Sequence, residues 1–403
     1  MPAIRSERLD ALTGLRFFAA FAIVLHHLPG SFGITHDTLH GYSLAQGVTV
    51  FFVLSGFVMR YAYPSIQTKR DALRFLANRI ARVWPAHLAT LTCALLIIGT
   101  FSPDTFLANM FLVQAWIPQS NYFFSYNAVS WSISTELSFY LAFPILILGF
   151  SRNWAVKLFA SIVVVMLMVK LCNDFEVPHY AGLSANVVLQ GFIMTNPLAR
   201  MFEFVLGMTA AELWLRWRHF LPTSQMIWSL MEAISVLMLL FNVSYILPIL
   251  WSMFPHSDAM AAWVSMSLSP ALATALLLIV LAEGNGLVAS FLGTRSLRFL
   301  GDVSFSIYMT HQLILHCFKL QVVSNWPFPV QLSAYLAIVL ASSVALYLHV
   351  ERPCQGWVKR YLSGASRNGV QKVALTQIYR VVEPPAPERH LAPLRRMLQR
   401  FLD

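Results

Sequence analysis

The chain has 403 residues, of which 57% are hydrophobic and only 11% are charged. Because soluble globular proteins carry about 25% charged residues, this composition excludes an ordinary soluble domain and predicts a polytopic membrane protein. The formal net charge of +10 does not indicate nucleic-acid binding. The Lys and Arg residues fall between apolar segments and in the tail, rather than on one basic face interleaved with aromatic side chains.

Ten segments are long and apolar enough to cross a bilayer, whose hydrocarbon core takes about 20 helical residues. The predicted spans are residues 11–29, 45–63, 84–101, 128–150, 155–172, 198–217, 226–248, 261–282, 301–322 and 330–350. The segment 104–118 is apolar but short, and we expect it to be re-entrant or interfacial. The predicted fold is therefore all-α, a transmembrane bundle of about ten helices.

Basic residues predict the orientation of these spans, because cytoplasmic loops are enriched in Lys and Arg. The connections after the even-numbered spans are basic, and residues 30–44, 102–127, 249–260 and 323–329 contain no Lys or Arg. We therefore expect both termini to be cytoplasmic.

The chain is predicted to end in a cytoplasmic tail. Residues 1–353 form the expected transmembrane domain, and residues 354–403 a basic tail that is partly disordered around a polar, Pro-bearing linker at 362–390. Leucines and a phenylalanine fall largely on one face of 391–403, with arginines between them. That pattern suits a short helix on an anionic membrane surface, although an unstructured basic tail explains it equally well.

The first span carries ionisable side chains, which usually face a protein interior or a wet cavity when they lie in a membrane. Arg16 and His27 are eleven residues apart, which puts them on one helical stripe, about 16 Å apart along the axis. His26 points about 80° away from that stripe. Since a histidine of ordinary pKa is largely neutral at pH 7, His27 could serve as a general base or an acyl-accepting nucleophile.

Arg79 and Arg82 are three residues apart, on neighbouring positions of one helical face, before a predicted bend at Pro85. Their guanidinium groups could meet lipid phosphates, or they could clamp the phosphates of a soluble donor such as a coenzyme. The sequence favours neither interpretation.

The fourth predicted span has a polar stripe, because Ser132, Glu136 and Tyr140 recur every fourth residue. A carboxylate in a membrane needs a partner or a proton. Glu136 could pair with Arg16 or a histidine to hold the bundle together, or it could act as a base or proton relay.

The ninth predicted span repeats the pattern, since Ser304, Tyr308 and His311 share a face. A buried lone histidine is more often a packing residue than a catalyst, and packing is the plainer interpretation of His311. The chain has no GxSxG, P-loop or HExxH motif, and its four cysteines lack metal-ligand spacing. Hydrolase, ATPase and zinc-protease functions therefore have no support, and no metal site is predicted.

Taken together, these segments resemble the acyltransferase-3 family of integral membrane acyltransferases, from about Arg8 to Pro353. The matching segments, in chain order, are RLDALTGLRFFAAFAIVLHH with its Arg-x10-His spacing, FFVLSGFV (51–58), RIARVWPAH (79–87), WSISTELSFYLAFP (131–144), FLGDVSFSIYMTH (299–311) and ERP (351–353). Each segment alone is a weak signal, but all six in order with ten spans are a strong one.

The resemblance implies an O-acyltransferase of the bacterial inner membrane, most often an acetyltransferase. It would use cytoplasmic acetyl-CoA or another acyl-CoA as donor and a hydroxyl of an extracytoplasmic or lipid-linked polysaccharide as acceptor. Some relatives acylate small molecules such as macrolides instead. The expected partners are membrane lipid and a polysaccharide synthesis or secretion complex, with no nucleic acid.

The resemblance also implies roles for residues. His27 would be catalytic, with Arg16 and Glu136 in the same site, and Arg79 and Arg82 would bind the coenzyme. The residues expected to contact substrate are His26, Ser132, Tyr140, Tyr308 and His311.

Two other functions use the same side chains. A transporter could pass protons or substrate along the intramembrane charges, although no inverted repeat of the transporter kind is evident. If the chain were a non-catalytic scaffold of a secretion complex, loss of His27 would leave acylation of the product unchanged.

Overall fold

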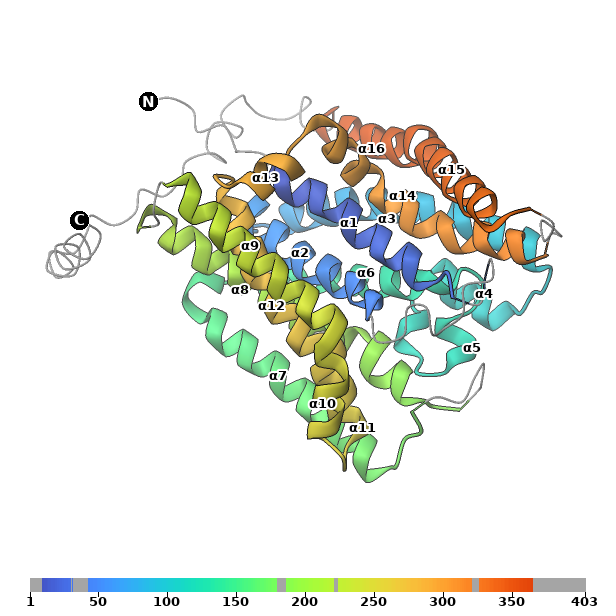
Figure 1. Cartoon of the computed structure of the whole chain (residues 1–403), viewed down its shortest axis with the longest axis horizontal. Coiled ribbons are helices and arrows are strands. Elements are labelled where there is room, and N and C mark those ends of the chain that lie inside the picture. The colour runs from blue at the N-terminus through green and yellow to red at the C-terminus, as the bar shows by residue number, and fades with distance from the viewer. Residues whose placement is uncertain are drawn as a thin grey trace, which may run out of the picture. The chain divides into compact units, whose positions relative to one another are not determined.

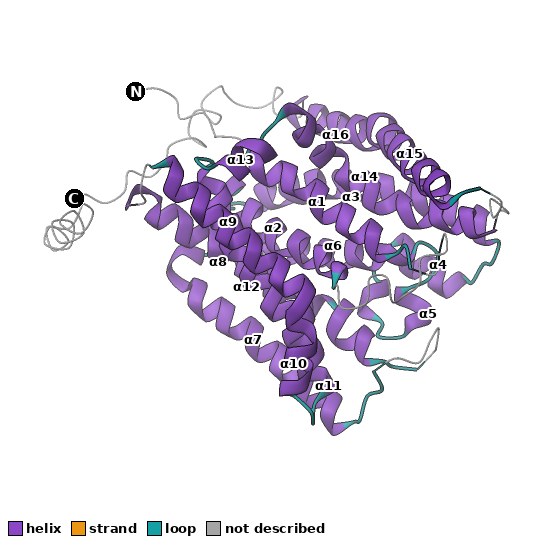
Figure 2. Cartoon of the chain, viewed as in Figure 1, coloured by secondary structure: helices purple, strands orange, loops and turns teal. Residues whose placement is uncertain are grey.

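The computed structural model describes residues 9–29, 31, 43–179, 186–220, 224–320 and 326–364. Within these ranges the chain is helical and has no β-strand (Figure 2), apart from one isolated bridge between Gln119 and Val187. The predicted all-α class is therefore confirmed for this part of the chain. The predicted interfacial helix at 391–403 and most of the predicted linker lie outside the described residues.

The α-helices are, in chain order, α1 (Asp10–His26), α2 (Gly47–Ala62), α3 (Lys69–Ile98), α4 (Pro103–Met110), α5 (Ser120–Phe123), α6 (Trp131–Leu146), α7 (Phe150–Asp174), α8 (Pro197–Trp217), α9 (Gln225–Phe241), α10 (Leu247–Met253), α11 (Asp258–Trp263), α12 (Ser269–Glu283), α13 (Leu287–Leu292), α14 (Arg295–Leu320), α15 (Phe328–Leu346) and α16 (Arg352–Gly364). Short 3₁₀ turns are η2 (Leu44–Gln46), η3 (Gln114–Trp116), η4 (Ala128–Ser130) and η6 (Arg218–Phe220), and π-helical turns are η5 (Gln190–Thr195), η7 (Asn242–Ile246), η8 (Val264–Leu268) and η9 (Tyr347–Glu351).

Each of the ten predicted spans coincides with a helix or a run of consecutive helices. Six helical segments of the described chain are long and apolar enough to cross a membrane: Leu44–Ala62, Lys69–Ile98, Phe150–Asp174, Gln225–Ser244, Asp258–Glu283 and Phe328–Leu362. Of the other predicted spans, α1 and α6 have 17 and 16 residues, and α8 and α14 carry several ionisable side chains. Ten crossings, and cytoplasmic termini, therefore stay predictions.

Helix α3 is longer than the predicted span, which began at residue 84. It begins instead at Lys69, where Thr68 and Asp71 form a reciprocal capping box, and it continues through Pro85 to Ile98. Proline is tolerated within membrane helices because neighbouring groups can satisfy the backbone carbonyl that it leaves free. Arg79 and Arg82 therefore lie on one continuous helix.

The centre of the bundle depends on close helix contacts at glycine. Helix α2 packs most extensively against α8, and α1 packs against α14 (Figure 1). A Cβ atom at Gly56 of α2 would lie 1.9 Å from the carbonyl oxygen of Phe204, and one at Gly207 of α8 would lie 1.9 Å from that of Val53. Only glycine allows two helix backbones to approach this closely.

Two buried ion pairs lie where these helices meet. Arg60 of α2 lies 2.5 Å from Glu212 of α8, and Arg200 lies 2.9 Å from Glu203 within α8. The second pair is extended by hydrogen bonds to Thr49 of α2 and Ser267 of η8. Both pairs satisfy charges that would otherwise be costly to bury.

The chain divides into two units, Met1–Gly356 and Trp357–Asp403, where the sequence had suggested a boundary between residues 353 and 354. The fold described above is that of the first unit. In the second unit, Trp357 and Tyr361 of α16 stack with ring centroids 5.9 Å apart.

Candidate functional site

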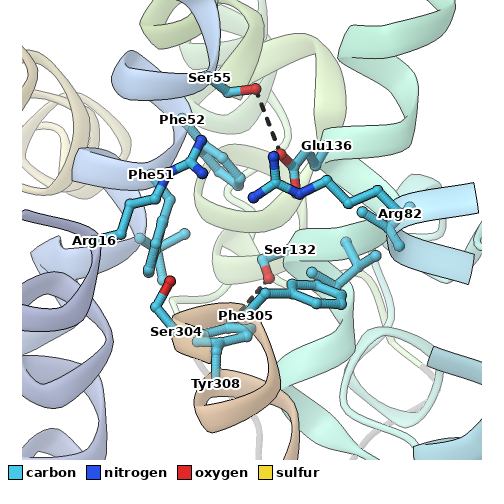
Figure 3. Close-up of a pocket in the computed structure, with 13 residues that line it drawn as sticks. Arg16, Phe51, Phe52, Ser55, Arg82, Ser132, Glu136, Ser304, Phe305 and Tyr308 are labelled. Carbon is cyan, nitrogen blue, oxygen red and sulfur yellow. Dashed lines mark hydrogen bonds between the residues drawn. The ribbon is translucent and has the colours of Figure 1, made fainter. Parts of the chain in front are cut away.

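A cavity lies in the first unit, lined by residues of α1, α2, α3, α6 and α14. Its polar lining residues are Arg16, Ser55, Arg82, Ser132, Glu136, Ser304 and Tyr308 (Figure 3). Its apolar wall includes the rings of Phe51, Phe52 and Phe305.

The charged side chains that line the cavity are two arginines and one glutamate. Figure 3 shows the guanidinium groups of Arg16 and Arg82 entering from opposite sides and pointing toward each other. Among the described residues, neither guanidinium makes an ion pair or a hydrogen bond with a protein group, and the one lining carboxylate is that of Glu136. Two cations facing one carboxylate favour a ligand that brings an anionic or strongly polarised oxygen.

Glu136 is held by hydroxyl groups. Tyr140, one turn along α6, donates a short hydrogen bond to Glu136, and Ser55 of α2 donates another at 3.4 Å (Figure 3). We had considered pairing of Glu136 with Arg16 or a histidine, but in the described structure its hydrogen-bond donors are these two hydroxyls. The carboxylate is thereby fixed while it still faces the cavity.

Two further hydroxyls are fixed where α6 meets α14. Ser132 Oγ lies 2.8 Å from Tyr308 Oη, and Tyr308 donates to the carbonyl oxygen of Val129 at 2.9 Å. The ring of Tyr308 also contacts Phe51 edge to face, with centroids 6.2 Å apart. The predicted polar stripes of the two helices therefore meet at this wall of the cavity.

Arg79 does not line the cavity, although it lies one turn before Arg82. Its guanidinium donates to Tyr63 Oη at 3.0 Å and lies over the rings of Tyr63 and Phe75, 5.4 and 5.8 Å from their centroids. The structure therefore separates the two arginines that the sequence had assigned to one ligand.

His27 lies at the far end of α1 from Arg16, and it is not among the residues that line the cavity. Its Nδ1 atom lies 2.9 Å from the carbonyl oxygen of Ile23 and 3.2 Å from Nε2 of His311. His26 is exposed, whereas His27 is half-buried and His311 is fully buried. Ile23, which is buried, lies between Arg16 and His27 on α1.

Two residues at the cavity had no role assigned from the sequence. Ser55 donates a hydrogen bond to Glu136 at the cavity. Arg200 is buried, and its guanidinium lies 5.1 Å from the ring centroid of Phe52, a cavity residue. Both contacts join distant helices, and no local pattern signals them.

No group of three or more His, Cys, Asp or Glu side chains within the described ranges could hold a metal ion.

Comparison with known proteins places these residues in a family. The model of a family described as acyltransferase domain matches residues 9–348, a range that includes every cavity residue. No solved structure matches the chain.

Three curated relatives are similar over most of the chain. Acyltransferase MdmB of Streptomyces mycarofaciens is 28% identical over 386 residues, covering 87% of this chain and 92% of the relative. Exopolysaccharide production protein ExoZ of Rhizobium meliloti is 27% identical over 352 residues, covering 83% of this chain and 97% of the relative. O-acetyltransferase OatA of Staphylococcus aureus is 24% identical over 326 residues, covering 76% of this chain but 50% of the relative.

Proposed function

The chain belongs to the acyltransferase-3 family, and on that premise we propose that it moves an acyl group from acyl-coenzyme A to a polysaccharide hydroxyl. The donor is a cytoplasmic acyl-CoA, in the first instance acetyl-CoA. The acceptor is an extracytoplasmic or lipid-linked polysaccharide, and the enzyme resides in a bacterial inner membrane, where it works beside polysaccharide synthesis or secretion proteins.

One observation carries this proposal: two guanidinium groups, Arg16 and Arg82, face each other across a cavity inside a helical bundle. Such a pair suits the phosphate or thioester oxygens of an acyl-CoA. In this assignment Arg82 contacts the donor directly. Arg79 packs on the rings of Tyr63 and Phe75 and supports Arg82 without contacting the donor.

The acceptor and the acyl group are proposed from the relatives. One relative is named as an exopolysaccharide production protein, which supports a polysaccharide acceptor. Another is named as an O-acetyltransferase, which supports transfer of acetyl to oxygen.

The proposed chemistry uses a lone pair on His27. As a general base, His27 takes the proton of the acceptor hydroxyl while its oxygen bonds to the thioester carbon, and the carbon–sulfur bond then breaks to release coenzyme A. As a carrier, His27 first forms an acyl-imidazole with release of coenzyme A, and the acceptor oxygen displaces the imidazole in a second step. Quenching purified protein shortly after addition of radioactive acetyl-CoA separates the routes, because only the carrier route leaves acid-labile label on the protein.

The function is tested by replacing each of two neighbouring histidines. A strain that lacks the gene is complemented with the wild type, with His27→Ala or with His26→Ala, and acyl groups on its surface and secreted glycans are measured by mass spectrometry. We expect the wild type and His26→Ala to restore acylation and His27→Ala to lose it by at least about 100-fold, the usual contribution of a general base.

His26→Ala is the matched control, because it removes an imidazole from the same turn of α1. The resemblance had assigned His26 to substrate contact, but its side chain is exposed and is not among the residues that line the cavity. Glycan acylation that is unchanged by loss of the gene would contradict the proposed acceptor. Full acylation with His27→Ala would contradict the catalytic assignment, and it is the result that a scaffold predicts.

A further inference from the structure

We propose that His311 is the positioning residue of His27: it accepts the Nδ1 proton of His27 and so favours the tautomer whose lone pair is on Nε2. This inference rests on the proposed function and assigns His311 a role within the same site. It replaces the packing role that the sequence favoured.

The protonation of both rings follows from their contacts with backbone carbonyl groups. His311 Nδ1 lies 2.7 Å from the carbonyl oxygen of Tyr308, and because a carbonyl oxygen can only accept, Nδ1 of His311 carries the proton. In a neutral His311 the Nε2 atom is therefore an acceptor.

The tautomer of His27 is fixed by two hydrogen-bond acceptors, and both require a proton on the same nitrogen. His27 Nδ1 lies 3.2 Å from His311 Nε2 and 2.9 Å from the carbonyl oxygen of Ile23. Both partners require Nδ1 of His27 to be the donor, so its Nε2 atom holds the lone pair when the ring is neutral. A base or nucleophile at His27 needs that tautomer.

His311 is well placed to hold another ring, because the segment of α14 around it is fixed on several sides. His311 itself is fully buried, and Tyr335 of α15 donates to its carbonyl oxygen at 3.2 Å. Asn127 donates to the carbonyl oxygen of Met309 at 2.9 Å, and Thr310 contacts Ser343 at 2.8 Å. The acceptor atom offered to His27 therefore has little freedom to move.

Tyr308 connects the histidine pair to the cavity. Its carbonyl oxygen sets the protonation of His311, and its side chain lines the cavity with Ser132. A displacement of α14 at this residue would disturb both.

The hydrogen bond between His27 and His311 stabilises the reacting state most after His27 has gained a positive charge. When Nε2 takes the proton of the acceptor hydroxyl, or bonds to the acyl carbon, the ring becomes cationic, and its Nδ1–H bond to His311 becomes a stronger, charge-assisted one. His311 therefore stabilises the charged ring more than the neutral one, and an interaction of that kind raises kcat rather than lowering KM.

The test compares two amide side chains at position 311. The Gln amide in His311→Gln can reach the place of the imidazole Nε2 atom and offer an oxygen to His27. The shorter amide in His311→Asn can reach only the place of Nδ1, so it keeps the contact with Tyr308 but withdraws the acceptor from His27. The two variants thus differ in the contact that they keep, with His27 in His311→Gln and with Tyr308 in His311→Asn, and they differ little in polarity.

Each variant is assayed in membrane vesicles of the producing strain, which hold the native acceptor, by transfer of label from radioactive acetyl-CoA to polysaccharide. We expect His311→Asn to lower kcat about 10- to 100-fold, as for loss of one hydrogen bond to a charged group, with KM for acetyl-CoA within twofold of the wild type. His311→Gln should stay within about fivefold of wild-type kcat, since it keeps that bond. Thermal unfolding of the purified variants monitors folding, and His311→Leu takes the place of His311→Asn if the latter does not fold.

Equal kcat losses in His311→Asn and His311→Gln, or wild-type kcat in His311→Asn, would overturn the inference. Wild-type protein and His27→Ala are measured beside them. If the wild type transfers label and His27→Ala does not, while His311→Asn matches the wild type, the inference fails and the proposed function stands. If the wild type itself transfers no label, the proposed function fails.

Discussion

Arg79 and Arg82 are one turn apart on α3, yet their guanidinium groups lie in different surroundings. Arg82 points into the cavity (Figure 3), whereas Arg79 lies against Tyr63 and Phe75. A residue that faces a ligand contributes to its binding, and one packed on aromatic rings contributes first to stability.

Their substitution by alanine should therefore have different effects. We expect Arg82→Ala to raise KM for acetyl-CoA about tenfold or more, because it removes a charge-assisted contact with the donor. Arg79→Ala should change KM by less than about threefold and lower stability by about 0.5–2 kcal/mol through loss of cation–π contacts. Initial rates of coenzyme A release over a range of acetyl-CoA concentrations give KM, and thermal unfolding gives stability.

Arg70→Ala is the control, because Arg70 is an exposed arginine in the first turn of the same helix. It should leave both quantities unchanged. A KM increase in Arg79→Ala as large as that in Arg82→Ala would show that both arginines bind the donor.

The contacts of a residue could be predicted from the sequence only where both partners lie on the same helix. Helical periodicity placed Ser132, Glu136 and Tyr140 on one stripe, and in the structure Tyr140 donates a hydrogen bond to Glu136 one turn away. It could not place His27 against His311, which are 284 residues apart, because periodicity carries no information about which helices become neighbours. That contact required the packing of α1 on α14.

At the scale of helices, the contact between α2 and α8 fixes the cavity wall. Gly56 and Gly207 bring the two backbones together, and Ser55, next to Gly56, is thereby presented to Glu136. The partner helix could not be predicted from the sequence, because Gly207 of α8 is 151 residues from Gly56 along the chain.

Adding a methyl group at either glycine should separate these helices. We expect Gly56→Ala and Gly207→Ala each to destabilise the protein by about 1–3 kcal/mol or more, as overpacking does, because the new Cβ atom would meet a backbone carbonyl that cannot rotate away. Thermal unfolding in detergent, with size-exclusion chromatography to measure the folded fraction, tests this.

Gly356→Ala is the matched control, since Gly356 is a helical glycine whose Cβ atom would have no neighbour within 4 Å. Gly99 would be a poor control, because its φ of +70° strains any other residue. Equal unfolding temperatures for Gly56→Ala and Gly356→Ala would contradict the close approach of α2 and α8.

Helix α3 shows why helix ends were harder to predict than helix existence. The predicted span began at residue 84, with a bend at Pro85, but the helix begins at Lys69. At 1.5 Å per residue its 30 residues extend about 45 Å, more than the roughly 30 Å of a hydrocarbon core. The apolar part of a helix can be recognised from composition, but its extension into the polar region has no hydrophobic signal.

At the scale of the whole molecule, the predicted topology decides which side of the membrane each half of the site faces. Arg16 lies toward the start of α1, where Asp10 pairs with Arg298 at 2.7 Å, and His27 follows its end. Their separation of about 16 Å is roughly half of a hydrocarbon core. With a cytoplasmic N-terminus, the arginine cavity lies toward the cytoplasmic donor and His27 toward the extracytoplasmic acceptor.

The opposite orientation would place His27 on the donor side and would remove the reason for transfer across the membrane. Accessibility of single cysteines distinguishes the two orientations, in a background where the native cysteines Cys93, Cys172, Cys317 and Cys354 are replaced by serine. Ser102→Cys precedes α4 and Lys69→Cys begins α3, and both positions are exposed. We expect a membrane-impermeant maleimide to label Ser102→Cys in intact cells and Lys69→Cys only after the membrane is opened, because the positive-inside rule places the basic start of α3 in the cytoplasm. Labelling of Lys69→Cys in intact cells would reverse the topology and, with it, the sides from which donor and acceptor reach the site.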